Sequence, residues 1–460
     1  MPDQMFAYAT GAVIVLMVAA NVFRREFDPF APVWLFLAGY AQVYVVQAIS
    51  YRDYALRARG MDVVLEANSR ALWALLWFLA VYFSGLGRIL ARKLPRAPRV
   101  WSPGLVAAAS PPMILWGLVC SGVLLAGPRD EAISDGEDLM RQFPILMLVG
   151  GNLLIVTGRE IGRRRPIFTI AGVVACAMYV VIWMFNGKRS HALFGVLTAV
   201  CSFYISRLRR PSIPIMAATG VTCAVVLTLA IGWRSNNLYE HSATGFLQYV
   251  GDFKAESILV NLNMKERPGA VVTSKSSMSK ETEEYGGYLL MLDTVPKKSG
   301  HDYGRTYLRV FSTYIPRMIW RTKPYYGRAE WLAAWQAGSE FPREDWFSGP
   351  AVGLLGATQL NGGRVATVVI LALLALMLRT AYDYYRTYAD SPWAQVWWAL
   401  TYYNAWLMTV NDNPMIWFYY IYGHTTLLPM AFFWVANRFR ETDHATAASF
   451  SPANYHPQGA

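Results

Sequence analysis

The sequence predicts an all-α, polytopic integral membrane protein of about 11 transmembrane helices with one large loop outside the membrane. Two compositional observations support this fold class: 55% of the 460 residues are hydrophobic, and only 16% are charged. Soluble domains carry about 25% charged residues, so the composition argues against an ordinary soluble protein. The third observation is the recurrence of apolar windows near the length of about 20 residues that a bilayer requires.

The apolar windows follow one another up to residue 232 and resume after residue 364. The first lacks the basic segment and cleavage site of a signal peptide, so we expect a retained span. All four cysteines fall inside windows without CxxC spacing, which predicts buried apolar side chains rather than disulfides or metal ligands. The windows are residues 4–22, 31–50, 71–90, 103–126, 143–158, 167–186, 190–206, 212–232, 365–384, 392–410 and 413–437.

Lys and Arg in the short connections predict the orientation, because cytoplasmic connections are enriched in them. With the N-terminus outside and the windows alternating, 18 Lys and Arg fall inside and 8 fall in the short outer connections. The acidic connection 130–138 also falls outside. The sequence therefore predicts that the N-terminus and the large loop face out and that the C-terminus faces in.

This topology divides the chain into four parts. They are a bundle of about 8 spans (1–232), a large loop with amphipathic helices (233–364), a bundle of about 3 spans (365–440) and a disordered tail (441–460). The large loop carries 16 of the 42 Lys and Arg residues. Long loops cross the membrane largely regardless of charge, so a tolerated soluble insert is one interpretation. The interpretation that we favour is a site for an anionic ligand.

Two pairs of arginines give the loop its most specific pattern. Arg317 and Arg321 are four residues apart, and Lys323 follows. A proline directly before Arg317 favours a helix start there. Arg305 and Arg309 repeat the spacing, with aromatic residues between the two pairs. Two guanidiniums on one helix face can grip phosphate oxygens, whereas the alternative is an interfacial helix whose arginines reach lipid headgroups.

A second basic element lies between two windows on the same predicted side. It is the turn Asn186-Gly-Lys-Arg-Ser-His191, in which Lys188 and Arg189 stand beside a hydroxyl and an imidazole. The upstream glycine of a P-loop is missing, so the sequence does not predict a nucleotide site here. The glycine-rich segment 348–364 predicts close helix packing, with a flexible lip over a groove as the alternative.

Candidates for acid–base chemistry are few. Asp252 and Glu256 have helical i,i+4 spacing after the eighth window, and His301 lies in the basic loop. Each acidic residue could equally be the partner of a nearby arginine. The chain has no HExxH, CxxC or DxD motif, so we expect no metal site and no cofactor. No nucleic-acid-binding motif accompanies the net charge of +12, and we expect no nucleic-acid partner.

At this point the chain resembles the Wzy-type oligosaccharide repeat-unit polymerases, which act in O-antigen and exopolysaccharide synthesis. The resemblance rests on Asp28-Pro-Phe-Ala-Pro-Val-Trp-Leu-Phe36, on Gly187-Lys-Arg-Ser190 and on the segment from Tyr303 to Pro324, followed by the glycine-rich segment. It covers most of the chain in layout and about a tenth of it in residue-level motifs. It implies a GT-C-like membrane enzyme at the periplasmic face of the bacterial inner membrane.

The resemblance also implies the chemistry. The enzyme would be a metal-independent glycosyltransferase whose donor is a glycan on undecaprenyl diphosphate, with membrane lipids and a chain-length regulator as further partners. Fixed cations would stabilise the leaving diphosphate, and Asp252, Glu256 or His301 would accept the proton of the acceptor hydroxyl. The implied diphosphate-binding residues are Lys188, Arg189, Arg305, Arg309, Arg317, Arg321 and Lys323.

Three other functions stay open. An O-antigen ligase would use a similar outer loop and differ only in its acceptor. A transporter of lipid-linked sugars would carry internal repeats and broken helices in corresponding halves, and the sequence shows no such symmetry. A structural membrane protein whose loop binds headgroups is the third.

Overall fold

The computed structural model of the chain describes residues 2–126, 143–160, 166–234, 239–240, 242–253, 284–308, 315, 319–320, 322, 351–410 and 427–444. Every regular element within these ranges is a helix. Seven of the described helices are long and apolar enough to cross a membrane. The predicted class, a helical multi-pass membrane protein, is therefore confirmed.

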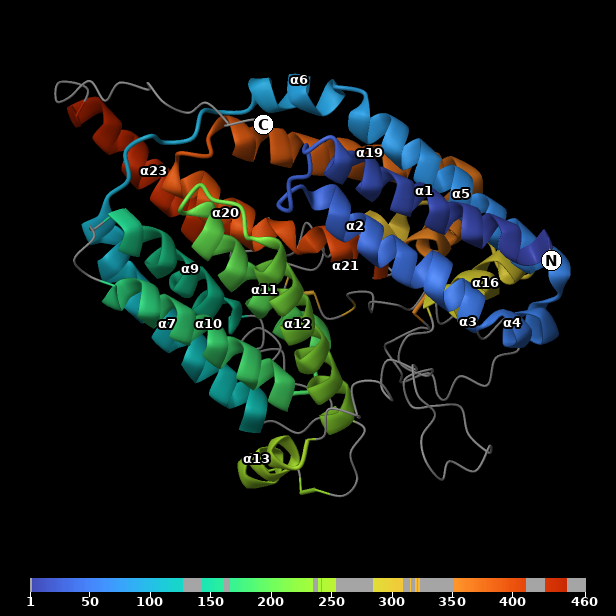
Figure 1. Ribbon diagram of the computed structural model, residues 1–460, viewed down its shortest axis with the longest axis horizontal. Helices are drawn as coiled ribbons and strands as arrows, with labels where there is room; N and C mark the ends of the chain where they lie inside the picture. Colours follow the sequence, from blue (N-terminus) through green and yellow to red (C-terminus); the bar gives the residue numbers. More distant parts are fainter. Residues whose placement is uncertain are drawn as a thin grey trace.

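The helices form two groups, each around its own core (Figure 1). In the first group α5 packs against α1 and α19, and α16 lies against the start of α19. Its members are α1 (Pro2–Phe23), α2 (Pro32–Ala41), the π-helix η1 (Gln42–Gln47), α3 (Ala48–Ser50), α4 (Arg52–Arg59), α5 (Met61–Phe83), α6 (Leu86–Lys93), α16 (Glu284–Thr294) and α19 (Gly353–Thr387).

In the second group α9 and α10 pack against each other, and α7 and α11 pack against α9. Helices α20 (Pro392–Tyr402) and α21 (Asn404–Val410) join the groups, since α20 contacts α9 and α11 while α21 contacts α2. The second group comprises α7 (Pro103–Ala126), α9 (Ile145–Glu160), α10 (Ile167–Phe185), α11 (Arg189–Ile205), α12 (Ile213–Arg234), α13 (Ala243–Gly251) and α23 (Leu427–His444).

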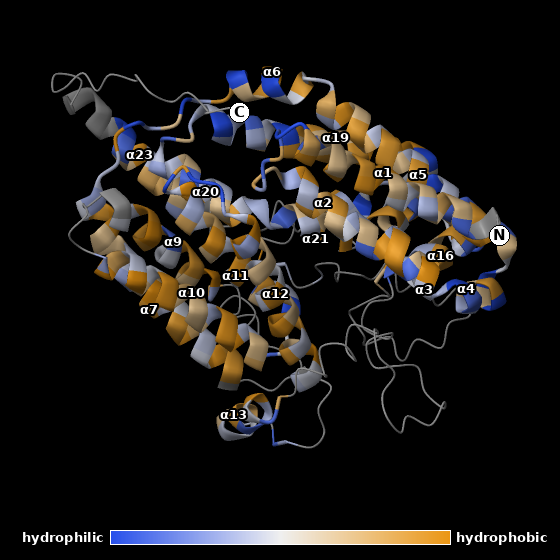
Figure 2. Cartoon of the chain, in the orientation of Figure 1, coloured by the Kyte–Doolittle hydropathy of each residue, from blue (hydrophilic) through white to orange (hydrophobic). Residues whose placement is uncertain are grey.

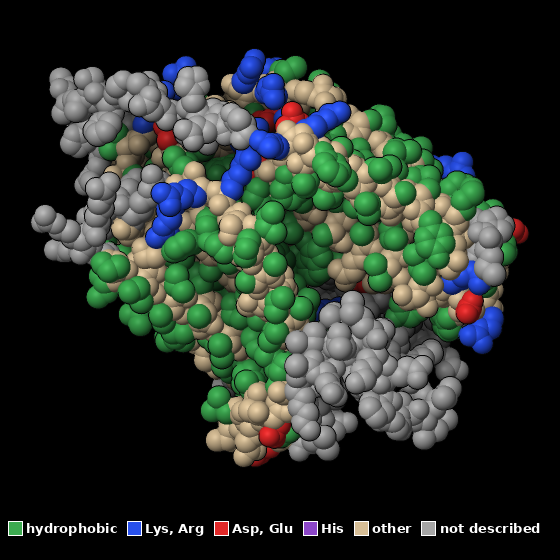
Figure 3. Space-filling view, viewed as in Figure 1, with side chains coloured by type: hydrophobic (Ala, Val, Ile, Leu, Met, Phe, Trp, Pro, Cys, Tyr) green, Lys and Arg blue, Asp and Glu red, His purple; other side chains and the backbone are tan. Residues whose placement is uncertain are grey.

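The outer faces of the long helices are apolar (Figure 2). Exposed side chains include Val119 on α7, Val174 on α10, Val221 on α12 and Val369 on α19. A soluble protein would place such residues inside, whereas a lipid-facing surface favours them outside. Lys and Arg gather along the upper edge of the molecule, where α6 lies, and the same face is hollowed between the two groups (Figure 3).

The charged connections collect at two opposite ends of the helices. At one end, which we call the α6 end, Arg210 donates to the carbonyl of Phe27 and Tyr382 donates to Asp28. At the other, which we call the α16 end, lie α4, α16 and the starts of α5 and α19. Connections that the sequence assigned to one side therefore lie together, as alternating spans require.

Two predicted windows were placed wrongly. The window 71–90 corresponds to α5, which begins at Met61 and ends at Phe83, followed by the separate helix α6. The window 365–384 corresponds to α19, which begins at Gly353 and bends at Gly362 and Gly363. In both cases charged or glycine-rich residues belong to the helix and not to a loop.

Other differences are smaller. The window 392–410 is divided at Tyr403 into α20 and α21. Helix α23 continues to His444, past the predicted end of the last bundle at residue 440. Most of the window 413–437 lies outside the described residues before α23. The four cysteines lie in helices without disulfides, three buried and Cys223 partly so, as predicted.

Candidate functional site

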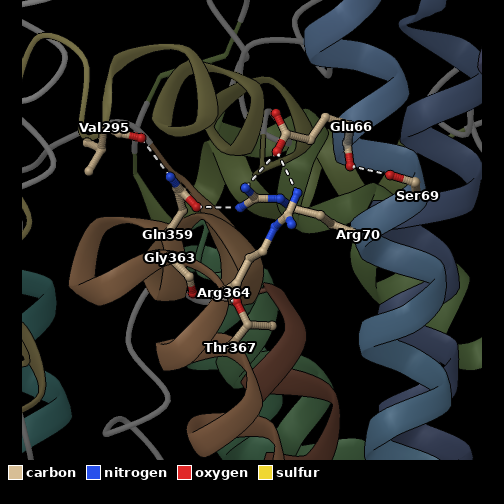
Figure 4. A network of polar contacts seen from close by, with 8 residues as sticks. All are labelled: Glu66, Ser69, Arg70, Val295, Gln359, Gly363, Arg364 and Thr367. Carbon is tan, nitrogen blue, oxygen red and sulfur yellow. Dashed lines mark hydrogen bonds and ion pairs between the residues drawn. The ribbon is translucent and has the colours of Figure 1, made fainter.

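A cluster of charges joins α5 to α19 at the α16 end (Figure 4). The Glu66 carboxylate accepts from Arg70 on the next turn of α5 at 2.7 Å, and Arg364 Nη2 lies 3.4 Å from the same oxygen. Arg70 also donates to Gln359 Oε1 at 2.6 Å. We call these four residues the arginine cluster. It has one carboxylate for two guanidiniums and is therefore cationic.

The two arginines of this cluster differ in exposure. The Arg70 side chain is 14% exposed, and its Nε is buried without a hydrogen-bond partner among the described residues. The Arg364 side chain is 70% exposed. An unpaired buried donor is costly, and an exposed guanidinium beside it can add further donors to the same anion. The arrangement is suited to binding oxygen atoms of an anionic ligand.

The bend in α19 creates this geometry. Gly363 has φ 62° and ψ −134°, a conformation that side chains with a Cβ seldom adopt. Thr367 donates to the Gly363 carbonyl at 2.9 Å and its oxygen lies 2.8 Å from Thr358 Oγ1, which ties the two halves of the helix together. The bend leaves both Gln359 and Arg364 directed toward Arg70. The glycine-rich segment is therefore part of the site and also a packing surface, as predicted, because Gly287 and Gly356 allow α16 to lie close to the start of α19.

The segment 301–308 of the basic loop docks on this bend. His301 Nδ1 lies 3.0 Å from the Gln359 carbonyl oxygen, and the Asp302 backbone N–H donates to the Leu360 carbonyl. Gly304 N–H donates to Asn361 Oδ1 at 3.0 Å. Two of the predicted residues, His301 and the exposed Arg305, are thus held next to the arginine cluster.

A buried carboxylic acid, Glu284, lies on the other side of α16. Gln47 of η1 donates to Glu284 Oε2 at 2.7 Å, and its carbonyl oxygen accepts from the Tyr285 backbone N–H. The Glu284 residue is only 5% exposed. Burial raises the pKa of Glu284, while the Gln47 hydrogen bond, its own backbone N–H and the charge of Arg189 act in the opposite direction.

Arg189 connects this carboxyl to the second helix group. Gly187 takes φ 71° in the turn after α10, and α11 begins at Arg189. The charge of Arg189 acts on Glu284 and favours its ionised form. Lys188 precedes α11, and its backbone N–H closes α10 through the Trp183 carbonyl.

The remaining predicted residues are not part of this arrangement. Helix α13 ends at Gly251, so Asp252 follows the helix and does not lie within it, and it accepts a hydrogen bond from Tyr239 at 2.8 Å. Helix α13 packs on α12 and lies far from α16 (Figure 1). The predicted residues Glu256, Arg309, Arg317, Arg321 and Lys323 lie outside the described residues.

Sequence reasoning missed five residues of the site: Gln47, Glu66, Arg70, Glu284 and Gln359. The i,i+4 spacing of Glu66 and Arg70 was a usable signal, because it predicts an ion pair on a helix face. Arg364 belongs to the segment that the sequence predicts as the large loop, and no role is predicted for it. Nothing local in the sequence distinguishes Gln47 or Glu284.

Within the described ranges no group of three or more His, Cys, Asp or Glu residues is arranged to hold a metal ion. Comparison of the chain with protein-family models, with curated proteins and with solved structures gave no match.

Proposed function

We propose that this protein is a metal-independent polymerase that joins oligosaccharide repeat units carried on undecaprenyl diphosphate into O-antigen or exopolysaccharide. It would act at the periplasmic face of the bacterial inner membrane, with about 11 spans, a GT-C-like fold and the C-terminus in the cytoplasm. The observation that carries the proposal is the arginine cluster at the α16 end of a multi-pass helical protein. The sequence resemblance to Wzy-type polymerases supplies the reaction.

The depth of the arginine cluster supports a lipid-linked ligand. Helix α19 has no charged residue between Arg364 and Arg379, a separation of about 22 Å at 1.5 Å per residue. The hydrocarbon core of a bilayer is about 30 Å thick. If Arg379, paired with Asp383 at the α6 end, lies at the inner surface, Arg364 lies at or below the level of the outer lipid phosphates. A diphosphate attached to a lipid tail would lie at that depth, whereas a soluble anion would have to leave the water to reach it.

In this proposal the cations hold the diphosphate and stabilise the charge that develops as it leaves. Arg70 and Arg364 supply donors from the helices, and Arg305 and Lys188 approach from the loop and the turn. Charge stabilisation of this kind requires no metal ion if enough donors are fixed in place. Arg309, Arg317, Arg321 and Lys323 remain predicted contributors to the same site.

The test is polymerisation by the purified protein in proteoliposomes that contain undecaprenyl-diphosphate-linked repeat units. We expect Arg364→Gln to reduce the rate by about 10- to 100-fold, because a charged hydrogen bond contributes about 1.5–3 kcal/mol. Arg364 is exposed, so its substitution should leave the fold intact. Arg210→Gln, the same change at the α6 end, is the matched control and should keep the wild-type rate.

A second test uses cells, in which the double variant Arg317→Ala/Arg321→Ala should leave only single lipid-linked repeat units. The products in cells and in proteoliposomes also separate the other candidate functions. Transfer of finished glycan to a lipid A core acceptor without chain growth would identify a ligase instead. Movement of lipid-linked sugar across the vesicle membrane without any new glycosidic bond would identify a transporter. Normal long polymer from well-expressed arginine variants would reject the diphosphate assignment.

A further inference from the structure

Glu284 is a buried carboxyl that takes no part in the proposed binding of the diphosphate. It is the first residue of α16, and among the described side chains Gln47 alone hydrogen-bonds it. A carboxylate has about four lone-pair positions, so one bond from Gln47 leaves acceptor capacity. Burying an ionised group costs free energy of folding unless the group is paired and hydrogen-bonded.

The π-helix η1 holds Glu284 in a fixed position. Gln47 makes two hydrogen bonds to α16: it donates to Glu284 Oε2 and accepts from the Tyr285 N–H. Three residues earlier, the Tyr44 hydroxyl accepts from the Leu355 N–H at the start of α19, at 2.8 Å. π-Helical segments are rare and occur frequently at functional sites. Here the distortion places two side chains of η1 on the starts of both helices that build the site.

Charged and polar groups surround helix α16. Arg189 approaches from α11 in the second group, and Tyr285, the next residue, donates from its hydroxyl to Asn68 on α5. On the far side of α16, Tyr288 is within electrostatic range of the arginine cluster. Elements packed against α16 carry further titratable groups at this end of the molecule. They include Tyr44 on η1, Arg59 on α4, which pairs with Asp293 of α16, Glu66 and Arg70 on α5, and Arg364 on α19. The charge of Arg189 therefore acts on Glu284 at the start of α16, and the arginine cluster acts on Tyr288 one turn further along the helix.

We propose that Glu284 is the proton acceptor for the hydroxyl of the incoming sugar. This inference rests on the proposed glycosyl transfer. The acceptor oxygen forms a bond to the anomeric carbon as the bond from that carbon to the diphosphate breaks. The diphosphate oxygen takes the electron pair of the broken bond, the arginines stabilise its negative charge, and the hydroxyl proton passes to the Glu284 carboxylate.

The other candidate bases are less well placed. Nδ1 of His301 is within hydrogen-bonding distance of the Gln359 carbonyl, which assigns that imidazole to holding the loop segment on α19. Asp252 lies at the end of α13, away from α16, and is bonded to Tyr239. Among the described carboxyls of the α16 end, Glu284 is the one that is buried and held in a fixed orientation by Gln47.

The test is the pH dependence of the polymerisation rate in proteoliposomes. Glu284→Gln keeps the size of the side chain and an oxygen that accepts from Gln47, so we expect it to fold normally. General-base catalysis contributes about 10²- to 10⁴-fold, and we expect a loss of at least 100-fold in kcat with KM unchanged. Glu284→Asp should retain part of the activity, because it keeps a carboxylate at a longer distance.

Gln47→Leu provides an independent readout. Gln47→Leu removes a hydrogen bond that favours the ionised carboxyl, so the acidic limb of the pH–rate profile should move to higher pH. The rate on the plateau should also fall, because Glu284 loses the bond that orients it. A structural role alone would not move this limb. A wild-type rate and profile for Glu284→Gln, or an unmoved limb for Gln47→Leu, would overturn the assignment of Glu284. Absence of polymer from the wild-type protein at every pH would instead reject the proposed function.

Discussion

The packing of α16 against the start of α19 leaves no room for a side chain at Gly287. A Cβ at this position would overlap the carbonyl oxygen of Ala351 and lie 2.8 Å from its carbonyl carbon and 3.0 Å from Val352 Cα. These are all backbone atoms, which cannot rotate out of the way. Gly287→Ala therefore has to push α16 away from α19, and with it Glu284 from the arginine cluster.

The magnitude follows from two opposing effects. Replacing glycine by alanine inside a helix stabilises it by about 1 kcal/mol. Overpacking a closely packed contact costs about 1–3 kcal/mol, and a clash with backbone falls in the upper part of that range. We expect a net loss of about 1–2 kcal/mol for Gly287→Ala.

Gly220→Ala on α12 is the matched control, because a Cβ at Gly220 meets no atom within 4 Å. This variant should be as stable as the wild type or slightly more stable. The measurement is the midpoint of thermal unfolding of both variants in the same detergent. Equal midpoints for Gly287→Ala and Gly220→Ala would refute the close contact between α16 and α19.

Two further predictions concern buried carboxyls. Asp383→Asn at the α6 end removes the partner of Arg379. Breaking a buried ion pair costs about 3–5 kcal/mol, but the rings of Tyr82 and Tyr382 still stabilise the cation in part. We therefore expect the free energy of unfolding, measured by thermal unfolding, to fall by about 2–3 kcal/mol. The double variant Arg379→Met/Asp383→Leu should lose less, and an unchanged midpoint for Asp383→Asn would contradict the pairing. Because the pKa of Glu284 is raised, the folded protein holds the carboxyl proton of Glu284 more tightly than the unfolded chain does. The wild type should therefore lose stability relative to Glu284→Gln as the pH rises from 4.5, the ordinary pKa of the group, through the raised pKa. Midpoints of both proteins at about pH 4 and about pH 8 test this, and a constant difference would show that Glu284 does not titrate with folding.

Helices bounded by clear polar segments could be predicted closely from the sequence. The windows 31–50, 103–126 and 167–186 correspond to the span Pro32–Ser50, to α7 and to α10. Hydropathy is enough to predict the bounds of these helices, because each apolar window is flanked by clear polar segments. The π-helical turn within Pro32–Ser50 was not predictable, since it depends on contacts of Tyr44 and Gln47 with residues more than 200 positions away.

The start of α5 shows why the rest was missed. Glu66 and Arg70 lower the hydropathy of its first half, so a window places the helix after them. In the structure Arg70 is compensated by Glu66 on the same helix and by Gln359, which is 289 residues away. A charge that is paired across the fold can be accommodated in a membrane helix, but its sequence neighbourhood still indicates a loop.

The cations at the two ends of the molecule have different physical explanations. At the α6 end, Arg379 is paired with Asp383, Arg207 stacks on Phe203 and Arg438 lies over Trp434. The α6 end is the predicted cytoplasmic side, and a basic edge with such partners is accounted for by that topology alone. At the α16 end, Arg70 and Arg364 share one carboxylate, and a buried donor of Arg70 stays unpaired among the described residues. Orientation in the membrane does not explain an excess of positive charge on that side, because the enrichment in Lys and Arg belongs to the cytoplasmic connections. An anionic ligand that supplies the missing acceptors would explain it, and this is the reason for proposing that the arginine cluster binds a diphosphate attached to a lipid.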